Sequence, residues 1–301
     1  MTKLLVVVTG PTASGKTELA VRLAEHYNTE IVSADSRQIY KDLPIGTAAP
    51  SPEECSRAFH HLVGTLPLDA YYSAARFEED ALAILENIWK HKDIAIVCGG
   101  SMMYVDALVN GIDEMPLVSA ETRNYVLSLL NQHGLEGVLA QLQICDPAYW
   151  QEVDRANTRR VVHALEVSLQ AGVPYSSLRT GAKKQRNFQC LKFALKLPRE
   201  DLFGRINTRV EKMIAAGLEH EARAAMQKGE FNSLNTVGYK EMGAYFRGEF
   251  TLPQAIARIQ KNTRVYAKKQ LTWLKRDSSV IWLHPENAYE RACSIISEII
   301  P

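Results

Sequence analysis

This sequence of 301 residues lacks paired cysteine motifs, long apolar runs and a strong net charge. Its five cysteines are scattered, and none forms the Cys-x-x-Cys pair typical of structural zinc sites or redox centres. No apolar run approaches the ~20 residues that span a bilayer, and the N-terminus lacks the regions of a signal peptide. The sequence also contains no internal repeat or low-complexity segment. These absences predict a cytoplasmic globular protein without a membrane segment.

The eight histidines show no spacing typical of metal ligands. Only His60 and His61 adjoin each other, and no nearby residue completes a ligand set. We therefore expect this pair to be structural or to lie at the entrance of a substrate site.

A complete phosphate-binding motif follows the apolar run Leu4–Val8 directly. It has the form G-x-x-x-x-G-K-[ST] and consists of Gly10, Pro11, Thr12, Ala13, Ser14, Gly15, Lys16 and Thr17. Backbone N–H groups of such a loop and the N-terminus of the next helix converge on an anion. The lysine adds a cation, and the threonine hydroxyl can bind Mg²⁺. An ordinary glycine turn is the alternative, but strand, loop and helix all stand where the motif requires them. We therefore predict a phosphorylated ligand.

Strands and helices alternate in the first third of the chain. The expected strands are Leu4–Val8, Glu30–Ala34 and Ile94–Cys98, with helices over Lys16–Tyr27 and from Ser73 to about Lys92. Such alternation predicts an α/β fold, a parallel sheet flanked by helices like that of P-loop NTPases. Ligands of such sheets bind at the carboxyl ends of the strands. The phosphate loop, Asp35 and Gly99–Ser101 follow such ends, so they should surround one cleft.

The middle of the chain reads as helices alone. Residues 113–186 contain helix breaks near Gly134, Asp146-Pro147, Ala156-Asn157 and Gly172, but no strand pattern. We predict that this segment is a helical insertion into a core formed by residues 1–112 and 187–301. The second part of the core is expected to contain strands at Cys190–Leu197 and Val280–His284, with helices at Glu200–Ala216, Leu218–Lys228, Thr236–Arg247 and Pro253–Lys275.

Several polar residues near the predicted cleft are candidates for chemistry. Asp35 can accept a proton from a nucleophile or hold Mg²⁺ through water, although a turn-forming role suits aspartate equally. Gly99 and Gly100 can let the backbone approach a ligand closely, or can simply form a turn. Arg209 can neutralise a leaving phosphate, or can lie on a solvated helix face.

The segment from Arg258 to Arg276 carries seven basic residues and no acidic one. Cations spaced along a helix can neutralise the backbone of a nucleic acid. A solvated helix face is the usual explanation for a charged run. The complete lack of acidic residues over this stretch favours nucleic acid.

The sequence resembles the bacterial tRNA dimethylallyltransferases over essentially its whole length. The resemblance rests on GPTASGKT at Gly10–Thr17, SADSRQIY at Ser33–Tyr40, Gly46-Thr47-Ala48, GGSMMY at Gly99–Tyr104, ALEV at Ala164–Val167, Val237-Gly238-Tyr239 and TRVYAKKQLTW at Thr263–Trp273. Many kinases share the first motif, whereas the others together are specific. The sequence departs from the family at Ala156-Asn157, where Asn-Asp is usual, and at His163, where arginine is common.

The resemblance implies transfer of a dimethylallyl group from dimethylallyl diphosphate to N6 of the adenosine just 3′ of the anticodon. The tRNAs concerned read codons beginning with uridine. The phosphate loop would then hold the diphosphate, with Mg²⁺ near Thr17. Asp35 would accept the N6 proton, Thr12 would lie near the reacting centre, and Lys16 and Arg209 would stabilise the departing diphosphate.

The same motif matching implies a set of tRNA contacts, with the helical insertion holding the anticodon stem-loop. These are Asp35, Ser36, Arg37, Gln38, Ser101, Arg123, Arg159, Arg160, Val237, Gly238, Tyr239 and Lys240, to which the basic segment adds Lys268 and Lys269. We expect the protein to act as a monomer. The alternatives are a small-molecule P-loop kinase, an isopentenyltransferase of free adenine nucleotides, and an RNA-binding module without enzymatic activity.

Overall fold

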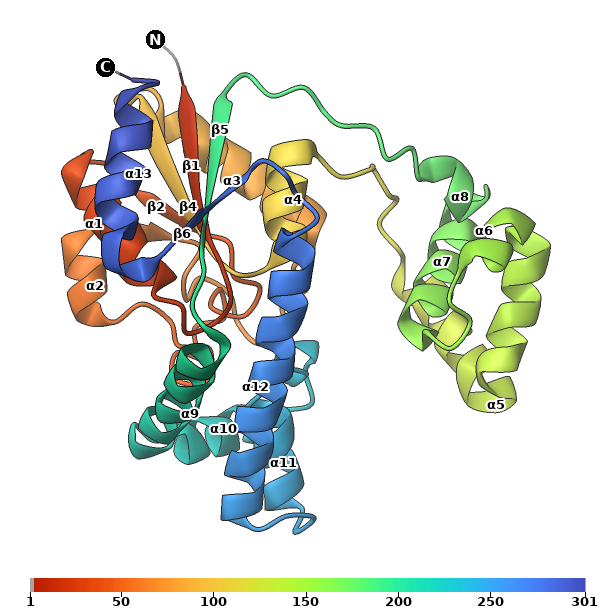
Figure 1. The fold of residues 1–301 in the computed structure, drawn as a ribbon. Helices are drawn as coiled ribbons and strands as arrows, with labels where there is room; N and C mark the ends of the chain where they lie inside the picture. The colour runs from red at the N-terminus through yellow and green to blue at the C-terminus, as the bar shows by residue number, and fades with distance from the viewer. Residues whose placement is uncertain (1–2, 301) are drawn as a thin grey trace. The chain divides into compact units, whose positions relative to one another are not determined.

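The computed structural model describes residues 3–300, which fold as two compact units (Figure 1). The first unit comprises the described residues up to Asn110 together with those from Gln185 onward, and the second is Gly111–Lys184. No helix among residues 3–300 is long and apolar enough to cross a bilayer.

A parallel sheet forms the centre of the first unit. Its strands are arranged in the order β3-β2-β4-β1-β5-β6, and every pair of neighbours is parallel. The strands are β1 (Leu4–Thr9), β2 (Ile31–Ser33), β3 (His60–His61), β4 (Ile94–Cys98), β5 (Gln189–Leu195) and β6 (Val280–Leu283). The predicted parallel α/β sheet is therefore confirmed. β5 pairs with β1 although the whole second unit lies between them in sequence.

Helices cover both faces of the sheet, because side chains of a strand alternate between its faces. Leu4, Val6 and Val8 pack with α1 (Lys16–His26) and α13 (Ala288–Ser297). Leu5 and Val7 pack instead with α3 (Ala74–Ile88) and α4 (Met102–Asn110). All side chains of β1 are buried, so its continuous apolar run reflects a strand enclosed on both faces.

Four further helices of the first unit gather at one end of the sheet (Figure 1). They are α9 (Arg199–Ala215), α10 (Leu218–Gln227), α11 (Tyr239–Phe246) and α12 (Leu252–Leu274). Buried residues of these helices share an apolar cluster with Ile39 and Leu43 of the loop after β2 and with Leu68, which follows β3. This packing places α9 and α12 next to the loops that follow the strands.

The second unit is helical, with its own core. It contains α5 (Ala120–Cys145), α6 (Pro147–Glu152), α7 (Thr158–Ala171) and α8 (Tyr175–Leu178). α5 kinks at Gly134, whose φ of 63° is left-handed, and α6 and α7 begin after the breaks expected from the sequence. Buried Asp146 joins two of the helices by accepting hydrogen bonds from Tyr149 N and Ser176 N.

Short elements account for most of the differences from the sequence analysis. No helix or strand was predicted between Ala34 and Ser73, but α2 (Pro52–Arg57) and β3 lie there. Ser51 caps α2 through a reciprocal capping box with Glu54. The helix expected from Thr236 begins only at Tyr239, because Gly238 has a φ of 98°.

Candidate active site

The phosphate loop curls tightly between β1 and α1. Gly10 and Gly15 have φ values of 138° and 96°, which other residues rarely adopt. A Cβ atom on Gly10 would also lie 3.1 Å from the backbone nitrogen of Leu195. Lys16 turns back and donates a hydrogen bond from Nζ to the carbonyl oxygen of Pro11 over 2.9 Å. The loop therefore holds its own lysine close to the space in which an anion can bind.

A pocket of about 520 Å³ opens in front of this loop. The segments predicted to meet at the strand ends all line it: the phosphate loop, Asp35 and the turn at Gly99 and Gly100. α9 and α12 complete the wall with side chains that include Arg209, Tyr266 and Gln270. The expectation of one cleft at the carboxyl ends of β1, β2 and β4 is thus confirmed.

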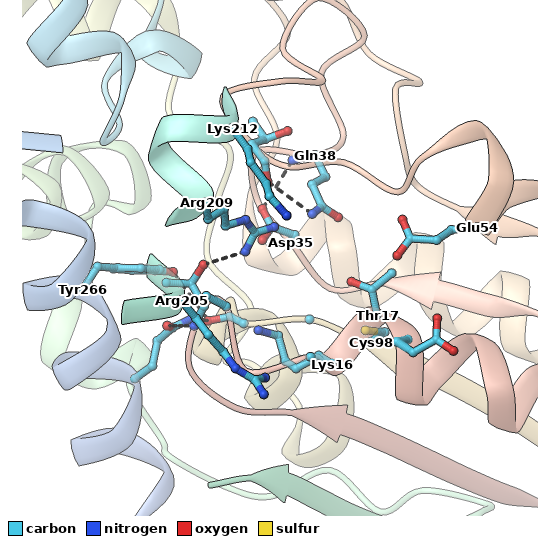
Figure 2. Close-up of a pocket in the computed structure, with 18 of the residues that line it drawn as sticks. Lys16, Thr17, Asp35, Gln38, Glu54, Cys98, Arg205, Arg209, Lys212 and Tyr266 are labelled. Carbon is cyan, nitrogen blue, oxygen red and sulfur yellow. Dashed lines mark hydrogen bonds between the residues drawn. The ribbon is translucent and has the colours of Figure 1, made fainter. Parts of the chain in front are cut away.

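Four cationic side chains line this pocket (Figure 2). Arg205, Arg209 and Lys212 come from one face of α9, and Lys16 comes from the phosphate loop. Of these three, only Arg209 was predicted from the sequence. Arg205 precedes Arg209 by four residues and Lys212 follows it by three, a spacing that indicates one helical face. Burial lowers the pKa of Lys16 to about 8 and also lowers the pKa of Arg209.

Thr12 is held from two distant segments. Arg209 donates a hydrogen bond to Thr12 Oγ1 over 3.1 Å, and Thr12 N donates one to Gln270 Oε1 over 2.9 Å. Neither contact follows from a local sequence pattern, because Arg209 and Gln270 lie far from the phosphate loop in the chain. The structure therefore adds Gln270 to the residues that shape the site.

The carboxylate of Asp35 forms a turn and also faces the pocket. Its Oδ1 accepts hydrogen bonds from Arg37 N over 2.9 Å and from Gln38 N over 3.3 Å. Gln38 in turn donates to the carbonyl oxygen of Ala48 over 2.9 Å. Since Asp35 also lines the pocket, the turn and a chemical role are compatible interpretations of the same residue.

A second pocket of about 240 Å³ adjoins the first. The residues common to both linings include Thr12, Asp35, Arg209 and Tyr266. The rest of the lining of the second pocket includes apolar residues of α9 and α12 and residues of two loops, namely Ile206, Val210, Ile259, Ser36, Arg37, Val237 and Gly238. Two ligands bound in these pockets would therefore meet at Thr12, Asp35 and Arg209.

The sequence pattern of the IPP transferase family matches residues 38–277, which is most of the chain. The chain belongs to this family. Among its relatives are two named tRNA dimethylallyltransferase 1. The one from Bacteroides thetaiotaomicron is 50% identical over 286 residues, covering 95% of this chain and 93% of the relative. The one from Phocaeicola vulgatus is 50% identical over 290 residues, covering 96% and 97%.

Solved structures of the family resemble this fold. A tRNA isopentenylpyrophosphate transferase from Bacillus halodurans is 30% identical, with a TM-score of 0.72 over 99% of this chain and 96% of that one. A eukaryotic dimethylallyltransferase described as acting on tRNA has a TM-score of 0.85 and 26% identity, covering 99% of this chain and 80% of that one. The parallel sheet and its flanking helices are thus common to this chain and solved IPP transferases.

Two family motif residues have different surroundings from those that the sequence analysis implied. Ser101 is 8% exposed, and its hydroxyl accepts a hydrogen bond from Ser36 N over 2.9 Å. Tyr239 is fully buried, and its hydroxyl donates to Glu221 Oε1 over 2.6 Å. Their side chains therefore support neighbouring loops, and contact of either residue with tRNA stays a prediction.

The carboxylate of Glu221 fastens the loop that carries Gly46. It accepts hydrogen bonds from Ile45 N over 2.7 Å and from Gly46 N over 2.8 Å, besides that from Tyr239. A Cβ atom on Gly46 would lie only 2.5 Å from the Tyr239 hydroxyl, so this position requires glycine. Glu221, which the sequence analysis missed, thus joins α10, α11 and a wall of the second pocket.

The glycines after β4 approach other parts of the protein closely. A Cβ atom on Gly99 would lie 2.1 Å from the carbonyl oxygen of Ala34, and one on Gly100 would lie 2.3 Å from Gln270 Nε2. Gly99 therefore makes room for the segment that follows β2, and Gly100 makes room for α12, while both also line the first pocket. A close approach of this turn to a ligand stays a prediction.

The remaining basic candidates are on helix surfaces. Lys268 and Lys269 are exposed on α12, and Lys240 is exposed at the start of α11. Arg264 donates a hydrogen bond to Asn207 Oδ1 over 2.6 Å, which uses part of its guanidinium within the protein. In the second unit Arg159 and Arg160 are exposed at the start of α7, and Arg123 lies 3.9 Å from Glu166.

The adjacent histidines and the pocket cysteine have no sign of a chemical role. His61 pairs with Glu30 and His60 contacts the carbonyl oxygen of Ala58, contacts that favour the structural interpretation. Burial raises the pKa of Cys98 to about 12, which keeps this thiol protonated. Among residues 3–300, no group of three His, Cys, Asp or Glu side chains could hold a metal ion.

The donor set at the pocket fits Mg²⁺. The lining of the pocket includes three residues with side-chain oxygen atoms, Thr17, Asp35 and Glu54 (Figure 2). Mg²⁺ prefers oxygen ligands, keeps several waters and is commonly shared between one or two protein groups and substrate phosphates. Thr17 would hold the ion directly, and the two carboxylates are placed to act through water.

Proposed function

We propose that this protein transfers a dimethylallyl group from dimethylallyl diphosphate to N6 of the adenosine just 3′ of the anticodon. The tRNAs would be those that read codons beginning with uridine, and diphosphate would be released. The observation that carries the proposal is that a phosphate pocket and a second pocket meet at Thr12, Asp35 and Arg209. The names of relatives about half identical in sequence supply the substrate class.

The cationic pocket suits the donor half of this reaction. When the allylic C–O bond breaks, negative charge develops on the departing diphosphate, and cations placed around it stabilise that charge. The pocket in front of the phosphate loop is lined by four such cations, Lys16, Arg205, Arg209 and Lys212. A bound Mg²⁺ would supply additional charge neutralisation of the diphosphate.

Asp35 suits the acceptor half. The N6 amine of adenine is a weak nucleophile because its lone pair is delocalised into the ring. It forms a bond to the allylic carbon while the C–O bond breaks, and a carboxylate beside it can accept the N6 proton. One oxygen of Asp35 is committed to Arg37 N and Gln38 N, which fixes the orientation of the carboxylate.

The second pocket suits a base that has left its stack. Enzymes that modify a base inside a folded nucleic acid must extrude it, and the bases of single-stranded loops are readily splayed out. We place the adenine in this pocket. The phosphates of the neighbouring RNA backbone would contact Arg37, Val237–Lys240 and the exposed Lys268 and Lys269. The helical unit, through Arg123, Arg159 and Arg160, would hold the anticodon stem-loop.

We further propose that the protein works in the cytoplasm as a monomer with Mg²⁺. Its proposed substrate is tRNA, and the lining of the first pocket includes the oxygen donors that fit Mg²⁺. A small-molecule P-loop kinase would explain the phosphate loop equally well. A kinase function would not explain the second pocket or the basic surface of α12.

The deciding experiment supplies purified protein with unmodified tRNA, dimethylallyl diphosphate and Mg²⁺, without ATP. Digestion of the tRNA and mass spectrometry should show an adenosine that has gained one dimethylallyl group in place of a hydrogen. Parallel reactions with AMP in place of tRNA test the enzyme of free nucleotides. Absence of transfer together with ATP turnover on a small metabolite would establish the kinase instead. Tight tRNA binding without any product would establish an RNA-binding module.

A further inference from the structure

The side-chain amide of Gln270 joins three segments that are distant in sequence. Its Oε1 accepts a hydrogen bond from Thr12 N over 2.9 Å, and its Nε2 donates one to the carbonyl oxygen of Gly100, also over 2.9 Å. The residue is 2% exposed. One amide on α12 therefore spans from the phosphate loop to the turn after β4.

The surroundings are built to admit this amide. A Cβ atom on Gly100 would lie 2.3 Å from Gln270 Nε2, so only glycine allows the contact in its present form. Tyr266, one turn earlier on α12, also reaches the carbonyl oxygen of Gly100, at 3.5 Å. A buried amide with both its donor and its acceptor satisfied defines one geometry, because any shift leaves a polar group unpaired.

The amide acts at the peptide that joins Pro11 to Thr12. The Thr12 N–H of this peptide is directed to Gln270, and the Thr12 hydroxyl accepts the hydrogen bond from Arg209. The carbonyl oxygen of the same peptide, that of Pro11, accepts the hydrogen bond from Lys16 Nζ. Gln270 thus fixes the part of the loop at which the two pockets meet, and it acts on Lys16 only through this one peptide.

We infer that Gln270 is a positioning residue for the transfer step: it holds Thr12 and Gly100 so that Thr12 and Arg209 face the reacting centre. This inference rests on the proposed function. Misplacement of a reacting group by about 1 Å can cost on the order of a hundredfold in rate. Loss of the amide should therefore lower kcat more than it weakens binding of the diphosphate substrate.

The test compares Gln270→Met with Gln260→Met in the full-length protein. Gln260 lies on the same helix and donates only a long hydrogen bond, 3.4 Å, to the carbonyl oxygen of Asn207, so it controls for the substitution itself. For each variant we would measure kcat, KM for dimethylallyl diphosphate, the melting temperature and the hydrogen exchange of the Thr12 amide. The exchange is measured without substrate and so does not depend on the proposed activity.

Gln270→Met should lower kcat by roughly tenfold to a hundredfold, change KM by less than about threefold, and speed exchange at Thr12 by at least about tenfold. Gln260→Met should resemble the wild type. If Gln270→Met does not fold, Gln270→Asn replaces it, because its shorter amide can reach only one of the two loops.

Three results of Gln270→Met would each overturn the inference: a kcat within about twofold of wild type, unchanged exchange at Thr12, or a KM that rises as steeply as kcat falls. A wild-type protein that transfers nothing would overturn the proposed function, while the exchange measurement would still decide whether Gln270 holds the loop.

Discussion

Arg209 donates a hydrogen bond to Thr12 Oγ1 over 3.1 Å, and it does so where the two pockets meet. This contact connects α9 to the phosphate loop and places a guanidinium beside the proposed leaving group. Burial lowers the pKa of Arg209, so the charge is held in surroundings poor in water, where it interacts strongly with an anion.

Replacement of Arg209 by methionine should lower kcat/KM for transfer by about 10²–10³, which is typical of removing one donor to developing charge. Steady-state kinetics with tRNA and dimethylallyl diphosphate measures this loss. Arg223→Met is the matched control, since Arg223 is exposed on neighbouring α10 and pairs with Glu219. Equal activity of the two variants would mean that Arg209 only supports the loop.

The carboxylate of Asp35 should matter for turnover more than for tRNA affinity. In Asp35→Asn the amide oxygen can still accept the hydrogen bonds from Arg37 N and Gln38 N, but the group cannot take up the N6 proton. We expect kcat to fall by about 10²–10⁴ while tRNA binding, measured by filter retention, stays nearly unchanged. Asp35→Ala should lose turnover as well, and additionally loosen the turn.

Asp42→Asn serves as the control for this series, because Asp42 pairs with Lys228 and does not line either pocket. A parallel loss of tRNA affinity and turnover in Asp35→Asn would show that this carboxylate is structural. Wild-type turnover would show that another group takes the proton.

The parts of the site that consist of local sequence motifs could be predicted from the sequence. The phosphate loop follows the fully buried strand β1, and Asp35 and Gly99 stand at strand ends, so local pattern and strand topology together located the cleft. The roles of Gln270 and Glu221 could not be found in this way. Gln270 stands in the motif at Thr263–Trp273, but the motif does not say which of its side chains meets the phosphate loop, and Glu221 stands in no motif. The hydrogen bonds that these two residues make to Thr12 and Ile45 span more than a hundred positions of the chain.

Motif matching also could not tell which side of the backbone a motif residue faces. Tyr239 and Ser101 stand in motifs around the pockets, yet their side chains point into the protein and bond to Glu221 and Ser36 N. The short α2 and β3 were missed because few residues contribute to each, and loop residues precede them. Exposure and long-range packing decide these features, and neither is encoded locally.

The affinity for diphosphate should depend on pH through Lys16. Burial lowers the pKa of this ammonium to about 8, and a bound anion favours its charged form, so the pKa is higher in the complex. Below this pKa Lys16 of the free protein already carries the proton, and the affinity for diphosphate has its maximum value. Above it, binding must take up a proton, and the logarithm of the affinity should fall by up to about one per pH unit.

Calorimetry with dimethylallyl diphosphate between about pH 6.5 and 9.5, roughly one and a half units to either side of the pKa of Lys16, checks this expectation. Lys16→Met should bind roughly tenfold to a hundredfold more weakly at neutral pH, since it loses a charge-assisted hydrogen bond. The ratio of wild-type to variant affinity cancels ionisation of the ligand. A ratio that stays constant over this range would contradict the assignment of Lys16 to the diphosphate.

The exposed lysines of α12 should contribute to the salt dependence of tRNA binding. Each phosphate contact made by a lysine releases condensed counterions, so Lys268→Gln with Lys269→Gln should reduce the slope of log K against log salt by up to about 2. Lys90→Gln with Lys92→Gln is the matched control, because these lysines precede β4 and lie at the opposite end of the strands from the pockets. An unchanged slope in the first variant would exclude this face of α12 from the tRNA interface.

The hydroxyl of Tyr239 should stabilise the fold without taking part in the chemistry. Tyr239→Phe removes the 2.6 Å hydrogen bond to Glu221 and leaves the apolar ring in its fully buried place. A buried hydrogen bond to a charged group contributes about 1.5–3 kcal/mol, so the free energy of unfolding in urea should fall by roughly that amount. Tyr289→Phe is the control, since its hydroxyl contacts His26 at an exposed position.

Because Glu221 also holds Ile45 N and Gly46 N, we expect KM for tRNA to rise modestly as this wall of the second pocket loosens. Tyr239→Phe with wild-type stability but greatly weakened tRNA binding would instead indicate that the hydroxyl is exposed to the RNA in the complex.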